Sequence, residues 1–217
     1  MMRNLISILL SITFFAPTLL FGQEVAVTER GDSVVLYSNG TWDYYENYLT
    51  GIDKVEEIRK NPEVFSVPKS SGKKINGLNQ AYELWYNDKN WKRIPAGELN
   101  PDADIALKYL HGDLYAMIIY EEVEISMENL VDIALDNAIG VAPDIKAVDK
   151  EYRKVNDNTV IWMRMDGTTQ GMSMSYYSYY YSNEMGTCQF HVFSGRNLID
   201  RYIEDVEDLL NGFQVGD

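Results

Sequence analysis

From about residue 78 onward, apolar and polar positions alternate along much of the chain, and this period of two predicts β-strands. The expected strands cover residues 78–86, 105–109, 114–123, 151–155, 160–166, 172–181 and 187–193. Short polar turns, such as His111-Gly112-Asp113, separate several of them. Strands joined by short turns pair as hairpins, so we expect one antiparallel sheet of about six or seven strands.

Two segments show the spacing of three and four residues that is typical of amphipathic helices. The first covers about residues 127–142, with Ser126 as N-cap and Pro143 at its end. Its expected buried stripe consists of Leu130, Ile133, Ala134, Ala138 and Val141. The second covers about residues 198–210, with Asn197 as N-cap and Gly212 as its stop. Two helices packed on an antiparallel sheet predict an α+β domain over residues 78–213.

The first 22 residues have the pattern of a signal peptide. Arg3 is their only charged residue, an apolar run covers residues 5–21, and the small Gly22 follows. A membrane anchor is the alternative, but the run is at the short limit for spanning a bilayer and is diluted by polar residues. We therefore expect an exported chain that is cleaved near Gln23, is located in the periplasm or outside the cell, and does not span the membrane.

Residues 24–48 are predicted to form an N-terminal β-hairpin. Asn39-Gly40 lies between two strand-like runs, and both residues tolerate the positive φ of a tight turn. Trp42 and Tyr44 would share one face of this hairpin, and we expect that face to pack on other residues. Residues 49–77 contain Pro62, Pro68 and a polar Ser-Ser-Gly-Lys-Lys run, so they are interpreted as a linker with a possible short helix over 53–60.

The composition argues against several kinds of partner and site. The formal net charge is −14, from 33 acidic and 19 basic residues, which argues against nucleic acid as a partner. The single cysteine, Cys188, rules out an intrachain disulfide, and we expect it to be buried in its strand. Phosphate-binding, zinc and calcium loop motifs are missing from the sequence, so we expect no cofactor and no metal ion.

Catalytic motifs are also missing. His191 and Cys188 are three residues apart in one strand, so their side chains point to opposite faces and cannot act as a pair. His111 lies at a turn, where a histidine is usually exposed. Three acidic runs, Asp102-x-Asp104 and residues 121–124 and 204–208, are interpreted as solvated surface, since calcium loops normally contain turn glycines at set positions. We therefore expect a protein that is not an enzyme.

The most unusual segment is residues 172–181, which contains five tyrosines in six positions. Tyr176 and Tyr180 share one face with Ser178, and the other three tyrosines occupy the opposite face. Such a strand is either the covered centre of the sheet or an aromatic binding platform. Our candidate binding residues are Tyr176, Tyr180 and His191, although the face on which His191 lies depends on the turn at residues 183–186.

The order of the elements resembles the PsbP-like fold of exported bacterial and photosynthetic proteins. Within it, Tyr115-Ala116-Met117-Ile118-Ile119-Tyr120-Glu121 and Gly186-Thr187-Cys188-Gln189-Phe190 are similar to recurring strands of those domains. Asn39-Gly40-Thr41-Trp42 also resembles a hairpin common near the start of small exported bacterial proteins. The resemblance implies the fold and a tendency toward non-catalytic assembly or binding roles, and it places no metal ligand on this chain.

These observations leave two functional hypotheses. The first is an exported, non-catalytic binding or assembly module that acts through an unknown protein partner or small ligand. The second is a periplasmic enzyme whose site combines His191, tyrosines and distant carboxylates. A buried cleft with His191 within hydrogen-bond reach of a carboxylate would favour the enzyme, and a flat or filled surface would favour the binding module.

Overall fold

The computed structural model describes residues 24–28, 30, 33–36, 42–44 and 58–216, and the chain divides into compact units at residues 1–56 and 57–217. In the N-terminal unit, the described strands β1 (Glu24–Val27), β2 (Ser33–Leu36) and β3 (Trp42–Tyr44) form an antiparallel sheet. Leu36 pairs with Trp42, and the rings of Trp42 and Tyr44 meet edge to face and are both exposed. The predicted signal peptide and the Asn39-Gly40 turn lie outside the described residues.

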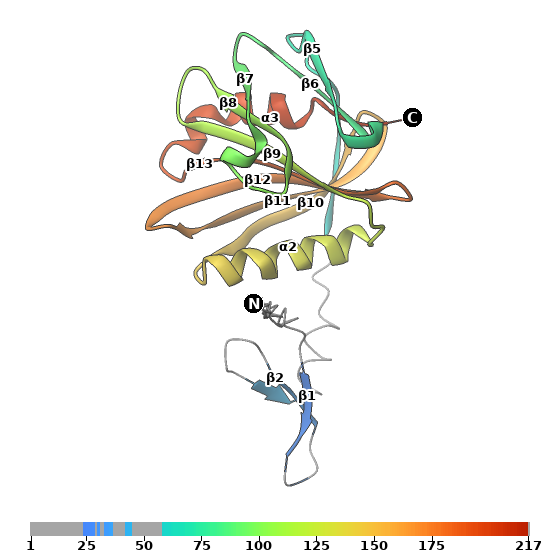
Figure 1. Cartoon of the computed structure of the whole chain (residues 1–217), viewed down its shortest axis with the longest axis vertical. Helices are drawn as coiled ribbons and strands as arrows, with labels where there is room; N and C mark the ends of the chain where they lie inside the picture. The colour runs from blue at the N-terminus through green and yellow to red at the C-terminus, as the bar shows by residue number, and fades with distance from the viewer. Residues whose placement is uncertain (1–23, 29, 31–32, 37–41, 45–57, 217) are drawn as a thin grey trace, which may run out of the picture. The chain divides into compact units, whose positions relative to one another are not determined.

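The C-terminal unit is built on a sheet of eight described strands in the order β4-β10-β11-β12-β13-β9-β8-β7. The strands are β4 (Arg59–Phe65), β7 (Trp91–Ile94), β8 (Ala103–Tyr109), β9 (Leu114–Glu121), β10 (Lys146–Val155), β11 (Asn158–Thr169), β12 (Met172–Asn183) and β13 (Gly186–Gly195). Neighbouring strands are antiparallel except β4 and β10, which run parallel. The sheet is therefore mixed and larger than the predicted antiparallel sheet, while the α+β class is as predicted (Figure 1).

Helix α2 (Met127–Val141) packs on one face of this sheet, over β10, β11 and β12 (Figure 1). The Ser126 hydroxyl accepts a hydrogen bond from the Asn129 N–H, so the predicted N-cap is confirmed. Leu130, Val131 and Ala134 are its buried residues. The predicted stripe was wrong at Ile133 and Val141, which are 43% and 79% exposed, because α2 covers only part of the sheet and turns these positions to solvent.

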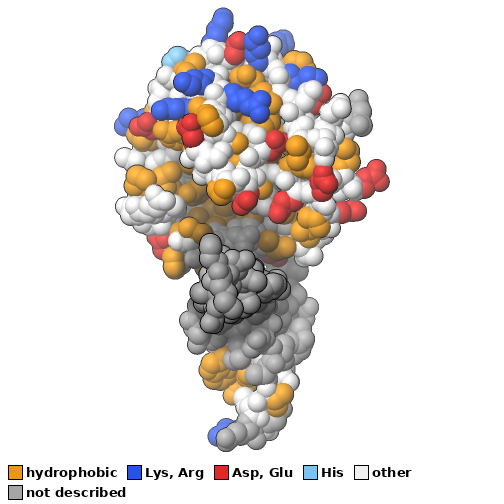
Figure 2. Space-filling view, viewed as in Figure 1, with side chains coloured by type: hydrophobic (Ala, Val, Ile, Leu, Met, Phe, Trp, Pro, Cys, Tyr) orange, Lys and Arg blue, Asp and Glu red, His pale blue; other side chains and the backbone are white. Residues whose placement is uncertain are grey.

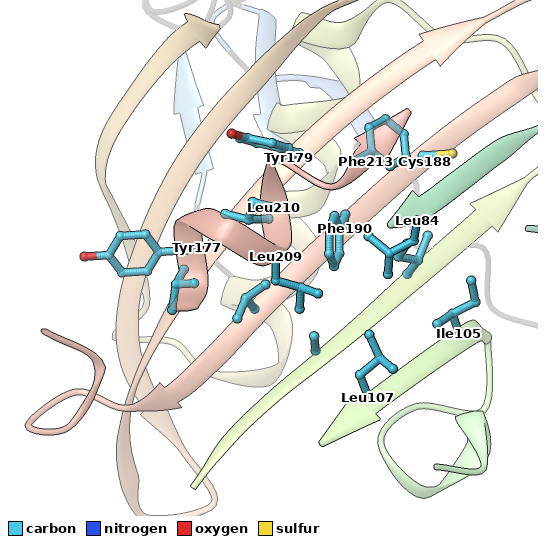
Figure 3. Packing of buried hydrophobic residues seen from close by; sticks show 14 of the residues in the cluster. Leu84, Ile105, Leu107, Tyr177, Tyr179, Cys188, Phe190, Leu209, Leu210 and Phe213 are labelled. Carbon is cyan, nitrogen blue, oxygen red and sulfur yellow. The ribbon is translucent and has the colours of Figure 1, made fainter. Parts of the chain in front are cut away.

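The opposite face is covered by the C-terminal helix and a second sheet. These elements are α3 (Ile203–Leu210) and the strands β5 (Lys73–Asn76), β6 (Tyr82–Tyr86) and β14 (Phe213–Val215). Short 3-10 helices join β5 to β6 (η1, Leu78–Gln80), β7 to β8 (η2, Ala96–Glu98) and β13 to α3 (η3, Ile199–Tyr202). In the described residues the second sheet has the order β14-β6-β5. Leu209, Leu210 and Phe213 pack against Tyr179 and Phe190 of the large sheet, and Figure 3 shows this cluster. Cys188 is free and buried in the same cluster, as predicted.

Two predictions about element boundaries were wrong. The predicted linker contains β4 and β5, and residues 59 and 60 of the proposed short helix lie in β4. Polar residues and Pro62 hide the alternation of β4, and this strand is defined instead by its pairing with β10 and by the 2.7 Å ion pair from Arg59 to Asp149. The second helix starts as the turn η3 and has no side-chain cap, so Asn197 is not its N-cap.

Candidate functional site

A pocket of about 450 Å³ lies beside α2 on the face of the large sheet that the helix only partly covers. Strands β9 and β13 form its floor, the C-terminal half of α2 forms one wall, and the loop before β8 forms another. Its lining residues are Leu99, Asn100, Asp102, Met117, Ile119, Glu121, Ala134, Asn137, Ala138, Val141, Ala142, Ile145, Met165, Thr169, Tyr176, Gln189 and His191. We call this cavity the α2 pocket. Its volume is in the range of pockets that hold small molecules.

His191 is a buried residue of the lining that a ligand in this pocket could reach. The residue is 7% exposed, and its Nδ1 lies 2.8 Å from the hydroxyl oxygen of Ser178 on β12. Among the described residues Nε2 has no hydrogen-bond partner, so this nitrogen remains for a ligand. Burial lowers the pKa of His191 to about 4, and the ring is therefore neutral at pH 7. A neutral imidazole can donate or accept one hydrogen bond at Nε2.

Tyr176 and Tyr180 lie on the same face as His191, but only Tyr176 lines the pocket. The Tyr176 hydroxyl is 3.1 Å from Thr169 Oγ1, and its ring stacks on Phe193 at 5.4 Å. Tyr180 is fully buried under α2, and its ring meets His191 edge to face. Its hydroxyl has no hydrogen-bond partner in the described structure, and burial raises the pKa of this phenol.

The other tyrosines of β12 show that the strand is the covered centre of the sheet. Tyr177 and Tyr179 are buried on the α3 face, and Tyr181 is packed against the same cluster. The Tyr179 hydroxyl donates to Asn211 Oδ1 at 2.7 Å. Tyr177, Tyr179 and Tyr180 are therefore core residues of a covered strand, as one of the two interpretations of this strand expected. Tyr176 is the tyrosine of this strand that a ligand in the α2 pocket could contact.

Two carboxylates line one end of the pocket. Ala103 on β8 pairs with Ile119 on β9, so the neighbouring Asp102 and Glu121 lie at the same end. The lining contains no Lys and no Arg, and no ion pair engages either carboxylate in the described part of the chain. The residues between these acids and Tyr176 are mainly alanines, isoleucines and methionines. The pocket can therefore hold an uncharged or cationic group and an apolar body.

The geometry gives little support to nucleophilic chemistry. The Ser178 hydroxyl that contacts His191 belongs to a residue with no exposed surface, so a substrate could not reach it. Among the residues that the structure describes, no carboxylate is hydrogen-bonded to His191, although Asp102 and Glu121 line the same cavity. Within the described residues, no group of three or more His, Cys, Asp or Glu side chains is arranged to hold a metal ion.

Part of the acidic run at residues 204–208 is structural, which corrects its interpretation as solvated surface. Glu207 accepts a hydrogen bond from Arg153 at 2.7 Å, and Asp205 accepts one from the Tyr109 hydroxyl, also at 2.7 Å. Arg153 is 8% exposed and lies over the Trp162 ring at 4.4 Å. These contacts join α3 to the large sheet. His111 is exposed at its turn, as predicted.

Sequence reasoning identified His191 and Tyr176 as candidates but missed the walls of the pocket. The contribution of the loop at residues 99–102 depends on the pairing of β8 with β9, which has a register shift between Ala103 and Ile105. The only signal in the sequence for the α2 wall was the run of small residues Ala134, Ala138 and Ala142. Small side chains on a helix leave space beside a sheet, and this space is the α2 pocket.

The protein is an α+β domain with a helix on each face of a large sheet and a pocket beside α2. The sequence matches no protein-family model and no curated protein. Among known structures, PsbP (CyanoP) from Synechocystis sp. PCC 6803 is similar, with 12% identity, a TM-score of 0.53, and coverage of 70% of this chain and 97% of that protein. The chain therefore has a PsbP-like fold.

Two further structures align less closely. LpqN of Mycobacterium tuberculosis, described as involved in cell envelope biogenesis, has 10% identity and a TM-score of 0.45 over 63% of this chain and 83% of its own. The Ran-binding protein Mog1p of Saccharomyces cerevisiae has 8% identity and a TM-score of 0.44 over 67% of this chain and 95% of its own. At such identities the likeness concerns the fold alone. In the described part of the chain, no helix is both long enough and apolar enough to span a bilayer.

Proposed function

We propose that this protein is an exported, non-catalytic binding module, and that the α2 pocket holds the apolar part of a small ligand or of a partner's side chain. The observation that carries the proposal is the pocket itself: about 450 Å³, mainly apolar walls, and a few polar groups that converge on it. That combination is typical of ligand sites. Among the polar groups, Nε2 of His191 and the Tyr176 hydroxyl could fix the orientation of the ligand.

The enzymatic alternative has one observation in its favour. His191 lies in a cleft and not on a flat or filled surface, as a site built from distant residues would require. Two observations favour binding over catalysis. His191 lacks a carboxylate partner that would orient it as a general base, and its hydroxyl neighbour Ser178 is inaccessible to a substrate. Export rests on the predicted signal peptide, and the high acidic charge supports a partner other than nucleic acid.

The test is a search for ligands that bind in the α2 pocket. The amide and side-chain NMR signals of the purified chain are followed while a panel of small apolar and amphiphilic compounds is added. We expect shifts centred on Met117, Gln189 and His191, because these residues form the floor of the pocket. Ala138→Phe places a ring in the pocket and should abolish the shifts. Ile133→Phe is the matched control, since Ile133 belongs to the same helix and does not line the pocket.

Two results would contradict the proposal. Shifts that survive Ala138→Phe in a folded protein would place binding elsewhere on the molecule. Conversion of a bound compound to a product, lost in His191→Phe, would establish the enzymatic alternative instead.

A further inference from the structure

We infer that the natural ligand of the α2 pocket carries a cationic amine or guanidinium group on an apolar body, with the cation beside Asp102 and Glu121. This inference rests on the proposed function, because it names the chemical class of ligand that the same pocket would take. The cation could belong to a free amphiphile or to the side chain of a partner, and both present the same chemistry to the pocket.

The distribution of charge around the pocket supports a cation. Asp102 and Glu121 lie together at one end, and the cavity lining within residues 58–216 contains no Lys and no Arg. Neither carboxylate takes part in an ion pair in the part of the chain that the structure describes, so neither is already neutralised. Placing an anion between two unpaired carboxylates would cost repulsion, whereas a cation there gains attraction from both.

The neighbouring elements add negative charge. Helix α2 carries Glu128, Asp132 and Asp136 and contains no basic residue. In Figure 2, most of the visible Lys and Arg side chains of the C-terminal unit gather instead at the end where Figure 1 places β5 to β7. A field of one sign beside a cleft raises the local concentration of ligands of the opposite sign.

A second and independent observation concerns His191, another residue of the pocket lining. His191 is more than nine-tenths buried, and its Nε2 is left without a partner inside the described structure. Because the buried ring is neutral at pH 7, it can hydrogen-bond a ligand without repelling a cation. Met117, Ala138 and Met165 also line the cavity and offer apolar surface to the body of the ligand.

Three probes with the same eight-carbon chain separate the possibilities: n-octylammonium, 1-octanol and n-octanoate. Their dissociation constants for the full chain are measured by calorimetry or by NMR titration at low salt and neutral pH. We expect octylammonium to bind about tenfold more tightly than octanol, and octanoate to bind more weakly than octanol, because two exposed carboxylates at one end of the cavity each add a modest attraction for a cation. At about 1 M salt the preference for the amine should shrink, because screening then acts over about 3 Å.

Matched variants locate the effect. Asp102→Asn with Glu121→Gln should reduce octylammonium binding to the level of octanol and leave octanol binding unchanged. Asp157→Asn with Glu184→Gln removes the same net charge from exposed positions outside both α2 and the pocket lining, and it should retain the preference. Ala138→Phe should abolish binding of all three probes. If that variant does not fold, Asn137→Trp at the exposed edge of the lining replaces it.

The outcomes separate this inference from the proposed function. Equal binding of octanol and octylammonium, or tightest binding of octanoate, would overturn the cationic class and leave a ligand pocket. A preference for the amine that persists in the Asp102 and Glu121 double variant would also overturn it. Binding of none of the probes, or binding unaffected by a folded pocket-filling variant, would overturn the proposed function and this inference together.

Discussion

At the scale of single residues, His191 shows how burial changes the chemistry of one group. Its ring lies on the α2 face of β13 and lines the α2 pocket, with Ser178 on Nδ1 and the Tyr180 ring at its edge. In the described part of the chain no opposite charge is hydrogen-bonded to it, and burial moves its pKa from 6.5 to about 4. At pH 7 its surroundings therefore keep this group neutral.

This shift predicts a pH dependence of the free energy of unfolding. Between pH 6.5 and about 4 the unfolded chain binds a proton at His191 and the folded chain does not, so the free energy of unfolding falls as the pH falls. The loss should total about 3 kcal/mol and be absent above pH 6.5. Urea unfolding of the wild type and of His191→Phe at a series of pH values measures it, because carboxylates contribute equally to both profiles.

The difference between those two profiles is the decisive quantity. It should be flat above pH 6.5, change between pH 6.5 and about 4, and be flat again below. Parallel profiles across the whole range would show that the ring is solvated in the folded protein.

At the same scale, the sequence could predict which residues share a strand face but not what faces them. The alternation in β12 places Tyr176 and Tyr180 together, and that much needs only the period of two. Whether His191 joins them depends on Asn183 pairing with Gly186 at the turn. A shift of one residue there would have placed Cys188 or Phe190 on the α2 face instead.

At the scale of elements, α3 is held to the large sheet by polar contacts as well as by its apolar residues. Val206, Leu209 and Leu210 are buried, and Glu207 reaches Arg153, which also donates to Glu151. Arg153 stacks over aromatic rings in a largely dry environment, so each of its acidic partners matters more than a surface ion pair would.

We therefore expect Glu207→Gln to lower the free energy of unfolding by about 1–2 kcal/mol, because a neutral amide compensates the buried guanidinium less well. The matched control is Glu204→Gln, since Glu204 is an exposed acid of the same helix without a hydrogen-bond or ion-pair partner in the described structure. It should change the stability by less than about 0.5 kcal/mol. Urea unfolding at pH 7 compares the two, and equal effects would mean that the contact with Arg153 adds no stability.

The elements that the sequence predicted well are those with a local signature. Ser126 and Pro143 mark the ends of α2, and alternation marks the long central strands. Strand β4 carries no such signature, since Arg59, Lys60 and Pro62 are polar or break the pattern. Its pairing is decided by β10, far along the chain, and tertiary contacts of this kind are absent from local sequence patterns.

At the scale of the whole molecule, the C-terminal unit contains both hydrophobic clusters within its own residues, from Ile58 to Val215. A chain of residues 57–217 should therefore unfold cooperatively by itself. A chain of residues 78–217, which starts at the boundary suggested by the sequence, lacks β4 and β5. It leaves Glu151 without Arg59 and Asn61, and Arg153 without the Phe65 ring.

We expect the free energy of unfolding of the shorter chain to be lower than that of residues 57–217 by more than about 3 kcal/mol, because the buried charged network loses several of its partners. Denaturant unfolding of the two chains, with circular dichroism as the signal, measures the difference. Equal midpoints would show that β4 and β5 are accessory strands and that the sequence boundary was adequate.

The parallel pairing of β4 with β10 also has a consequence for the order of events during synthesis. Asn61 and its partner Glu151 are 90 positions apart, so β4 is made long before the strand that receives it. Chains emerge from the ribosome N-terminus first, and in that interval β4 has to wait as a single unpaired segment. A strand segment that stays unpaired is prone to aggregate unless charges or proline interrupt it. The sequence pattern does not reveal β4 because it contains Arg59, Lys60 and Pro62. The same charges and proline would keep β4 from pairing with a neighbouring nascent chain before its own sheet has formed.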